Sequence, residues 1–239
     1  MRKLTLKSFT LVVIFSLLKL NSQALYNDAI VVSDCKIASQ VGLDILKKGG
    51  NAIDASIATA FTLAVTLPSA GNIGGGGFIV FLNSDNESKT IDFREKAPIN
   101  STKGMFLDES GNLIRGINHN SVLSIGVPGT VAGLFFAHKK YGKISWKKLI
   151  QPAIDIANNG FIMTKGLYSS AKNVISKKQT FFLKNYFNND QNEIVKPGEV
   201  WYQKKLAKTL EAIRDSGKDG FYDGWVAKKI ISFMEQNDG

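Results

Sequence analysis

The amino-acid sequence predicts an α+β fold, because strand-like and helix-like patterns of apolar residues both occur along it. Residues 29–32 form a short apolar run typical of a strand, and the next apolar residues recur every four positions, as on one helix face. Two further strand-like runs, 78–82 and 89–93, flank a polar turn and predict a hairpin. From residue 130 onward the pattern is mainly helical.

The two helices expected before the hairpin have recognisable ends. Ser33 or Asp34 can cap a helix that begins at Cys35, and a glycine pair after it supplies the positive φ that ends many helices. Residues 51–67 are rich in alanine and apolar on most faces. They predict a buried helix that Pro68 stops.

Helical patterns also dominate the carboxyl-terminal part of the chain. Gly160 and Gly217 stand where helix-ending glycines are typical. The segment 161–201 is polar, rich in Lys and Asn and weakly patterned, and we expect it to be loop-like. The expected helices are 130–141, 146–158, 204–216 and 225–236.

The composition is that of a globular protein. The chain has 239 residues, of which 44% are hydrophobic, with 22 glycines and a single cysteine. These values exclude collagen, low-complexity disorder and a small disulfide-stapled scaffold. Lys and Arg number 30 against 20 Asp and Glu, but only four of the basic residues are arginine. Nucleic-acid readers commonly use arginine forks, so we expect no nucleic acid as a partner.

The amino terminus has the pattern of an export signal. It has a basic start, an apolar run over residues 9–18 and the small-residue pattern Ser22-Gln23-Ala24. The run is too short to span a bilayer, which needs about 20 apolar residues. We therefore expect a signal peptide at 1–24, a mature chain at 25–239 without a stable membrane span, and a periplasmic or secreted location. An uncleaved membrane anchor is the alternative.

Signals for several common sites are missing. The glycine run 74–77 precedes a predicted strand, whereas a dinucleotide-binding loop opens a helix. We expect these glycines instead to let another segment or a substrate approach the backbone. His119 and His138 form no ligand cluster with Cys35, so no metal is expected. Cys35 is a candidate nucleophile only beside a basic group, and a packed residue at a helix start is the simpler interpretation.

Arg94 is the candidate binding residue. It follows a predicted strand in the segment Asp92-Phe93-Arg94-Glu95-Lys96, and a strand end can hold a guanidinium rigidly. The planar guanidinium matches a carboxylate with two charge-assisted hydrogen bonds. From position alone, a structural ion pair with Glu95 or Asp92, or a solvated side chain, is the favoured interpretation.

A set of short segments in a fixed order changes the favoured interpretation of Arg94. They are GGNAIDA at 49–55, the four-glycine run within 71–78, REKAP at 94–98, GVPGTVAG at 126–133, and the later Tyr141-Gly142, Trp146, Pro152-Ala153-Ile154 and Gly160-Phe161. Through them residues 29–239 resemble the γ-glutamyltranspeptidase (glutathione hydrolase) family, in the amino-terminal part of its large subunit. The resemblance makes Arg94 the match of the arginine that grips the substrate's α-carboxylate.

The resemblance also implies a fold and a reaction. The implied fold is the N-terminal-nucleophile hydrolase αββα sandwich, made by a precursor that cuts itself into a large and a small subunit. The Thr exposed by the cut attacks the γ-glutamyl carbonyl of glutathione or a related compound, with its own α-amine as base. Water or an amino acid then takes the γ-glutamyl group from the acyl-enzyme. No organic cofactor is expected, because none is implied by the family that the chain resembles.

The chain departs from the family pattern in a way that bears on activity. It contains no Thr-Thr pair, with which the family's small subunit opens, and it lacks the glycine pair of the oxyanion hole. We therefore expect no catalytic nucleophile in this chain, an incomplete sandwich and a missing small-subunit half. The chain alone is expected to be inactive, because it lacks the nucleophile. It is also expected to aggregate, because a sheet face stays uncovered. A truncated remnant, one half of a split enzyme and a fragment of a precursor all remain open.

Two other functions also remain open. One is a non-enzymatic half-domain that binds γ-glutamyl ligands through Arg94, although one arginine without a closed pocket gives little affinity. The other is a cephalosporin-acylase-like member of the same fold group. The REKAP segment, which implies a glutamate-like substrate, weighs against the acylase.

Overall fold

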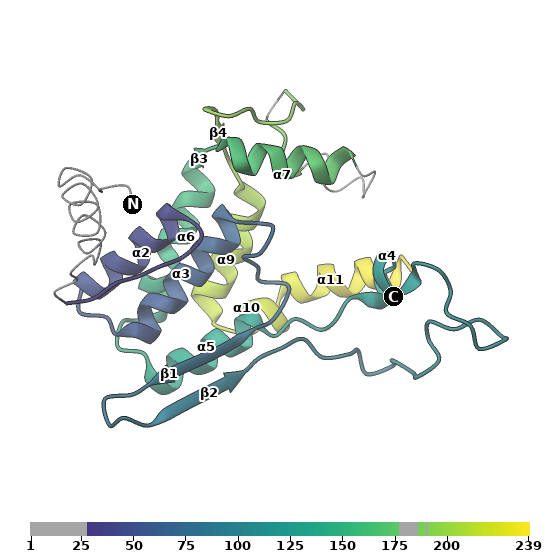
Figure 1. Cartoon of the computed structure of the whole chain (residues 1–239), viewed down its shortest axis with the longest axis horizontal. Helices are drawn as coiled ribbons and strands as arrows, with labels where there is room; N and C mark the ends of the chain where they lie inside the picture. Colours follow the sequence, from purple (N-terminus) through teal and green to yellow (C-terminus); the bar gives the residue numbers. More distant parts are fainter. Residues whose placement is uncertain (1–27, 177–185, 190) are drawn as a thin grey trace, which may run out of the picture. The chain divides into compact units, whose positions relative to one another are not determined.

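The computed structural model describes residues 28–176, 186–189 and 191–239, so the expected signal peptide at 1–24 lies outside the described residues. The chain divides into two units, residues 1–30 and 31–239, and every element below belongs to the second (Figure 1). No helix in the described part of the chain is both long and apolar enough to cross a lipid bilayer.

The first two helices form over the predicted residues, but the predicted cap of the first one by Ser33 or Asp34 is wrong: its N-cap is Cys35, and it has no side-chain cap among the described residues. Helix α2 spans Lys36–Lys47, and Lys48 is its C-cap. The next residue, Gly49, has a φ of 87°, which suits a residue without a side chain. Helix α3 spans Ala52–Thr66 and begins with a capping box. In that box the Asn51 side chain accepts a hydrogen bond from the Asp54 amide, and the Asp54 carboxylate accepts one from the Asn51 amide.

The strand predicted at 29–32 is wrong. The segment has no strand assignment, and no strand among the described residues pairs with it. Ile30 is 50% exposed and Val32 is 80% exposed. An apolar run of this length needs a neighbouring strand to satisfy its backbone, and the sequence alone could not supply that partner.

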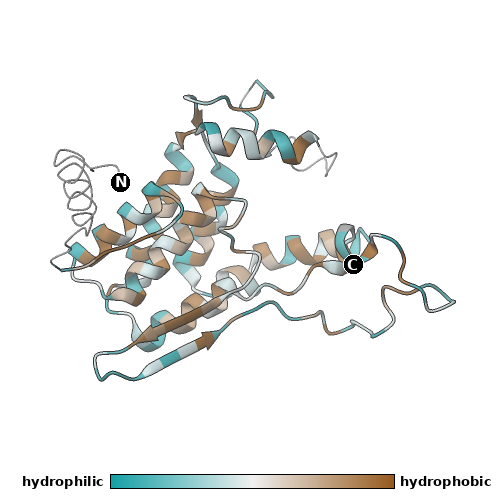
Figure 2. Cartoon of the chain, viewed as in Figure 1, coloured by the Kyte–Doolittle hydropathy of each residue, from teal (hydrophilic) through white to brown (hydrophobic). Residues whose placement is uncertain are grey.

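The predicted hairpin is confirmed. Strand β1 (Phe78–Leu82) pairs antiparallel with β2 (Ser88–Asp92), with Phe78 opposite Asp92 and Leu82 opposite Ser88. Ile79, Phe81 and Ile91 pack on the hydrophobic core, whereas the alternate residues of β1 face outward. Strand β1 is therefore apolar on both faces, as its unbroken brown colour shows (Figure 2).

The predicted helices of the carboxyl-terminal part are also confirmed. The structure adds short helices before α5 and after α9 that the sequence pattern did not predict. The bounds are α4 (Ile117–Asn120), the 3-10 helix η1 (Val122–Ser124), α5 (Thr130–Tyr141), α6 (Trp146–Asn159), α9 (Lys204–Ser216), α10 (Asp219–Tyr222) and α11 (Trp225–Glu235).

The expectation of a loop over 161–201 is wrong in part. This segment contains β3 (Phe161–Ile162), α7 (Lys165–Ser176) and β4 (Val200–Trp201), with β3 and β4 paired antiparallel. A second apolar cluster holds them, formed by Met163, Ala171, Phe187, Val195 and Trp201. These residues lie far apart in sequence, so no local periodicity reveals the cluster.

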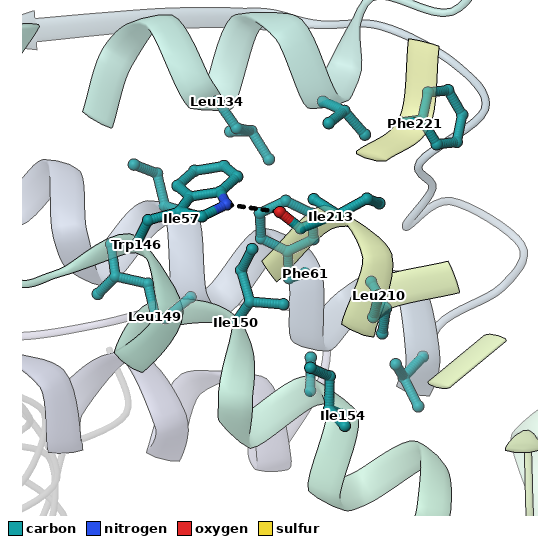
Figure 3. Close-up of a cluster of buried hydrophobic side chains, with 14 of the residues drawn as sticks. Ile57, Phe61, Leu134, Trp146, Leu149, Ile150, Ile154, Leu210, Ile213 and Phe221 are labelled. Carbon is teal, nitrogen blue, oxygen red and sulfur yellow. Dashed lines mark hydrogen bonds between the residues drawn. The ribbon is translucent and has the colours of Figure 1, made fainter. Parts of the chain in front are cut away.

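The main core lies between helices α2, α3, α5, α6 and α9. Trp146 is one of its buried residues and lies close to Phe61 (Figure 3). The rings of Phe61 and Phe135 are edge-on to the indole at 5.5 and 5.1 Å between centroids. The Trp146 indole N–H donates to the Ile213 carbonyl oxygen at 2.9 Å, which satisfies its one polar group inside the core. This packing ties α3, α5, α6 and α9 into one layer of helices against which the hairpin lies.

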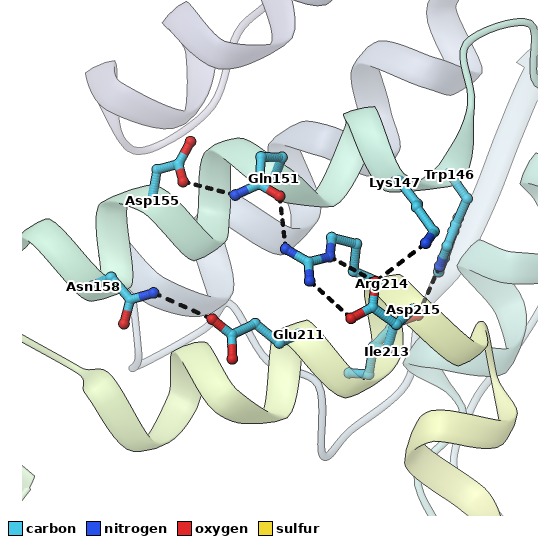
Figure 4. A network of polar contacts seen from close by, with 9 residues as sticks. All are labelled: Trp146, Lys147, Gln151, Asp155, Asn158, Glu211, Ile213, Arg214 and Asp215. Carbon is cyan, nitrogen blue, oxygen red and sulfur yellow. Dashed lines mark hydrogen bonds and ion pairs between the residues drawn. The ribbon is translucent and has the colours of Figure 1, made fainter.

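A network of charged and amide side chains connects α6 and α9 at the surface (Figure 4). Arg214 donates two hydrogen bonds to Asp215, at 3.0 and 2.8 Å, and one to the Gln151 side chain at 2.8 Å. Lys147 lies 3.4 Å from the same Asp215 carboxylate. The hydrogen bonds from Arg214, followed by the contact with Lys147, lower the pKa of Asp215 to about 2.

We expect this pair to make stability depend on pH in the acid range only. Because the folded pKa of Asp215 lies below the unfolded value of 3.8, its stabilisation is fully present above pH 3.8 and is lost as pH falls towards 2. The melting temperatures of wild type and Asp215→Asn should therefore differ slightly at pH 5 to 7 and converge near pH 2. High salt should shrink the difference at neutral pH, because the pair is solvent-exposed. A difference that stays constant down to pH 2 would contradict this assignment.

Candidate functional site

Arg94 lies just beyond the end of β2, where the chain leaves the hairpin. The Asp92 carboxylate accepts a hydrogen bond from the Arg94 backbone N–H at 3.0 Å, which shapes the turn out of the strand. The Arg94 side chain is 67% exposed, and its guanidinium carbon lies 6.0 Å from the centre of the Phe78 ring. Its one ion pair among the described residues is with Glu95, at 3.9 Å. An exposed pair at that distance holds the guanidinium weakly, so Arg94 has hydrogen-bonding capacity left for a ligand.

A groove of about 760 Å³ opens beside Arg94. Most of its wall is apolar, but charged residues of both signs also line it: Lys96 and Lys218 beside Arg94, and the acidic residues Asp92 and Glu95. Lys218 is paired with Asp219 at 2.6 Å. Tyr222 from α10 contributes a hydroxyl. The lining residues are 91–96, 127–129, 132, 133, 136, 218 and 222. A carboxylate-bearing ligand of small size fits the chemistry of this surface.

The glycine run holds the Arg94 backbone from one side. A Cβ added to Gly76 would lie 2.7 Å from the Arg94 Cα, too close for any side chain. The Gly75 carbonyl oxygen accepts the backbone N–H groups of Gly129 and Thr130, at 2.7 and 3.0 Å. The expected close approach of another segment to these glycines is confirmed, and the run leads into β1 rather than into a phosphate-binding helix.

The GVPGTVAG segment holds the same backbone from the other side. Lys96 and Val127 exchange two backbone hydrogen bonds, at 3.2 and 2.7 Å. A Cβ on Gly129 would overlap the carbonyl oxygen of Phe93, and one on Gly133 would overlap the Phe93 side chain. Glycines in two motifs far apart in sequence thus make room for Phe93 and Arg94.

The other candidates from the sequence do not join this site. Cys35 is half-buried at the N-cap of α2, where the Ser33 hydroxyl donates to its carbonyl oxygen at 3.0 Å. His138 hydrogen-bonds through Nε2 to the Ile144 carbonyl oxygen at 2.8 Å and packs beside Trp146. Within the described residues, no three His, Cys, Asp or Glu side chains gather as metal ligands.

Two groove residues escaped the sequence analysis. Lys218 and Tyr222 reach the groove from α10 and the turn before it, more than 120 positions after Arg94. No motif marked them, because their relation to Arg94 arises only from tertiary contacts, such as those of Tyr222 with Pro128 and Ala132 at the start of α5.

A second cavity of about 470 Å³ lies between the end of α3 and α7. Its lining is mostly apolar, with Ser170, Asn72 and Tyr186 among the polar side chains. Burial raises the pKa of Tyr186 to about 12, so its hydroxyl stays protonated and donates to the Gln203 side chain at 2.6 Å. Among the described residues, no charged side chain lines this cavity, which leaves the groove at Arg94 as the better candidate for binding an acid.

Comparison with known proteins identifies the family of the chain. Residues 38–239 match the γ-glutamyltranspeptidase family. A glutathione hydrolase proenzyme of Pseudomonas sp. (strain A14) is 44% identical over 216 residues, which cover 89% of this chain and 37% of the relative. The crystal structure of Helicobacter pylori γ-glutamyltranspeptidase superposes with a TM-score of 0.86 at 41% identity, over 90% of this chain and 62% of that chain.

A more distant structure has the same architecture. Cephalosporin acylase from Bacillus halodurans is 27% identical and superposes with a TM-score of 0.74, over 92% of this chain and 43% of that chain. The mixed helical and sheet arrangement is thus part of the N-terminal-nucleophile hydrolase fold, and this chain spans little more than a third of the Pseudomonas relative's length. With a match over residues 38–239 and these neighbours, the chain belongs to the γ-glutamyltranspeptidase family.

Proposed function

We propose that this chain is the amino-terminal portion of the large subunit of an exported γ-glutamyltranspeptidase. The whole enzyme cleaves the γ-glutamyl amide of glutathione and related compounds and passes the γ-glutamyl group to water or an amino acid. The observation that carries the proposal is the family match over residues 38–239. The open groove that Arg94 lines supports a binding role for this residue. A signal peptide at 1–24 and a periplasmic or secreted location belong to the same proposal.

In this proposal the chain binds and orients the substrate, and the chemistry is done elsewhere. Arg94 grips the α-carboxylate of the γ-glutamyl group with two charge-assisted hydrogen bonds. A threonine hydroxyl from the remaining half attacks the γ-carbonyl carbon. The amide C–N bond breaks, and the amine leaves with a proton. Water or an amino acid then displaces the threonine oxygen from the resulting ester.

The outer face of β1 supports a large contact with the remaining half. Phe78, Val80 and Leu82 are 61, 76 and 62% exposed, although they stand in a row on a five-residue strand. A monomeric protein rarely leaves such a row uncovered, because exposed apolar strand residues promote association. We propose that the small-subunit half covers this face.

Replacing Arg94 by alanine should lower kcat/KM for a γ-glutamyl anilide about a hundredfold, because a charge-assisted pair of hydrogen bonds to the substrate is lost. The effect should fall mainly on KM, since the α-carboxylate is bound alike in the ground state and the transition state. The measurement is steady-state kinetics on the complete gene product. Arg115→Ala is the matched control, because Arg115 is exposed and does not line the groove. Equal kinetics for both variants would contradict the role of Arg94.

The first test of the whole proposal is the gene sequence beyond the codon for Gly239, in every reading frame. A Thr-Thr-His stretch followed by small-subunit motifs supports the proposal. If no such stretch occurs there or elsewhere in the genome, no nucleophile is available and the proposed enzymatic function is contradicted. A soluble chain of residues 25–239 that hydrolyses γ-glutamyl anilide at ordinary rates would equally contradict the proposed division of roles.

The same experiments separate the two rival functions. Calorimetry of the chain with glutamate should give little heat. A binding protein would be favoured by two results together: a heat of binding that disappears in Arg94→Ala, and a genome that encodes no catalytic half. Faster turnover of glutaryl amides than of γ-glutamyl amides by the complete enzyme would favour an acylase, because the two substrates differ in the α-amino group.

A further inference from the structure

The position of Arg94 depends on the turn at residues 127–129. Lys96, two residues after Arg94, exchanges two backbone hydrogen bonds with Val127, at 3.2 and 2.7 Å. Gly129 lies directly against the carbonyl groups of Phe93 and Arg94, with no room for a Cβ. A displacement of this turn would therefore move the backbone from which the Arg94 side chain extends.

Helix α5 starts at this turn without the usual side-chain cap. Its N-cap is Gly129, which has no side chain, and the first amides of a helix have no partner within the helix. The Thr130 amide is satisfied by the Gly75 carbonyl oxygen at 3.0 Å. The Ala132 amide, in the same first turn, is satisfied by the Tyr222 hydroxyl at 3.2 Å.

Tyr222 also holds the turn itself. Its hydroxyl donates to the Pro128 carbonyl oxygen at 2.8 Å while it accepts from Ala132. The Tyr222 hydroxyl oxygen thus connects Pro128, which precedes the N-cap of α5, to the first turn of α5. Burial raises the pKa of Tyr222 above its ordinary value of 10, although the hydrogen bond from the Ala132 amide opposes this shift. The hydroxyl therefore keeps its proton at neutral pH and remains a donor.

We propose that Tyr222 is a positioning residue for Arg94: it acts as a cap supplied from α10 that locks the turn at 127–129 and, through it, the backbone of Arg94. Tyr222 and Arg94 line the same groove, so the locked turn is also part of the groove wall. The structural role stands on the contacts above, whereas its effect on substrate binding rests on the proposed function of Arg94.

The structural test is hydrogen exchange followed by mass spectrometry on the full chain at micromolar concentration. In Tyr222→Phe the ring remains and only the hydroxyl is lost. We expect the amides of Val127, Ala132 and Lys96 to exchange about tenfold faster than in wild type. The Lys96 amide is the informative reporter, because it bonds Val127 and does not touch Tyr222. Unchanged exchange at Lys96 would overturn the proposal.

Tyr186→Phe is the matched control. It removes a tyrosine hydroxyl that donates a hydrogen bond of 2.6 Å to Gln203, next to the second apolar cluster and away from the groove. It should lower the unfolding midpoint without changing exchange at Lys96. Faster exchange at Lys96 in both variants would indicate general loosening and would overturn a specific role for Tyr222.

The functional test uses the complete gene product. Tyr222→Phe should raise KM for a γ-glutamyl anilide about fivefold with kcat nearly unchanged, because substrate binding rather than chemistry depends on Arg94. Tyr186→Phe should leave KM as in wild type. If Arg94→Ala itself leaves KM unchanged, the proposed function fails while the exchange result still decides the structural role. If Arg94→Ala raises KM and Tyr222→Phe does not, the inference about Tyr222 fails alone.

Discussion

Replacing Asp54 by alanine should lower the free energy of unfolding by about 4 kcal/mol, a large part of the 5–15 kcal/mol typical of a domain. Asp54 is fully buried near the start of α3. Its carboxylate accepts the backbone N–H groups of Asn51, Lys143 and Ile144, at distances between 3.0 and 3.3 Å. The alanine variant leaves these donors without a protein partner. It also cuts the link between the α3 cap and the turn that leads into α6.

The measurement is urea unfolding followed by tryptophan fluorescence, to which the buried Trp146 and Trp201 both contribute. Asp54→Asn keeps the shape of the side chain but turns an amide towards the same N–H groups, so it should lose somewhat less stability. Asp44→Ala is the control, because Asp44 lies on neighbouring α2 and its carboxylate accepts a hydrogen bond from the Gln40 side chain at 2.8 Å and from no backbone amide of the described residues. It should change stability by less than about 0.5 kcal/mol. A similar loss for Asp44→Ala and Asp54→Ala would refute the buried-carboxylate argument.

A single methyl group at Gly133 should cost about 3 kcal/mol of stability and disturb the site as well. Gly133 lies in the first turns of α5, where alanine would ordinarily be the better helix former. Here its Cβ would overlap the Phe93 side chain, which belongs to the residue immediately before Arg94. The ring must move, and the strand end that carries Arg94 must move with it.

A double-mutant cycle isolates this contact. Phe93→Ala removes the obstacle, so Gly133→Ala should cost little in that background, with a coupling of about 2 kcal/mol. Gly166→Ala in α7 is the matched glycine control, because nothing lies within 4 Å of its Cβ position. That variant should be as stable as wild type or slightly more stable. If Gly133→Ala costs the same with and without Phe93, the overlap is not the cause.

Much of the local structure could be predicted because its signals are local. The helix-ending glycine at 49, the buried helix that stops before Pro68 and the two apolar runs of the hairpin each depend on neighbours within a few positions. The same holds for the REKAP and GVPGTVAG segments, whose recognition singled out Arg94. By contrast, the supposed strand at 29–32 and the supposed loop at 161–201 failed, because each depended on partners distant in sequence.

The sequence by itself determined the family, most helix boundaries and the choice of Arg94 as the binding candidate. These rest on motifs and periodicity, which depend on residues close together in the sequence. Only the tertiary structure decided how Arg94 is held. Gly76, Gly129 and Gly133 make space for the strand end, and Tyr222 reaches it from α10. The physical reason is that close backbone approach and a cap supplied across the fold depend on distances between segments, which no local pattern encodes.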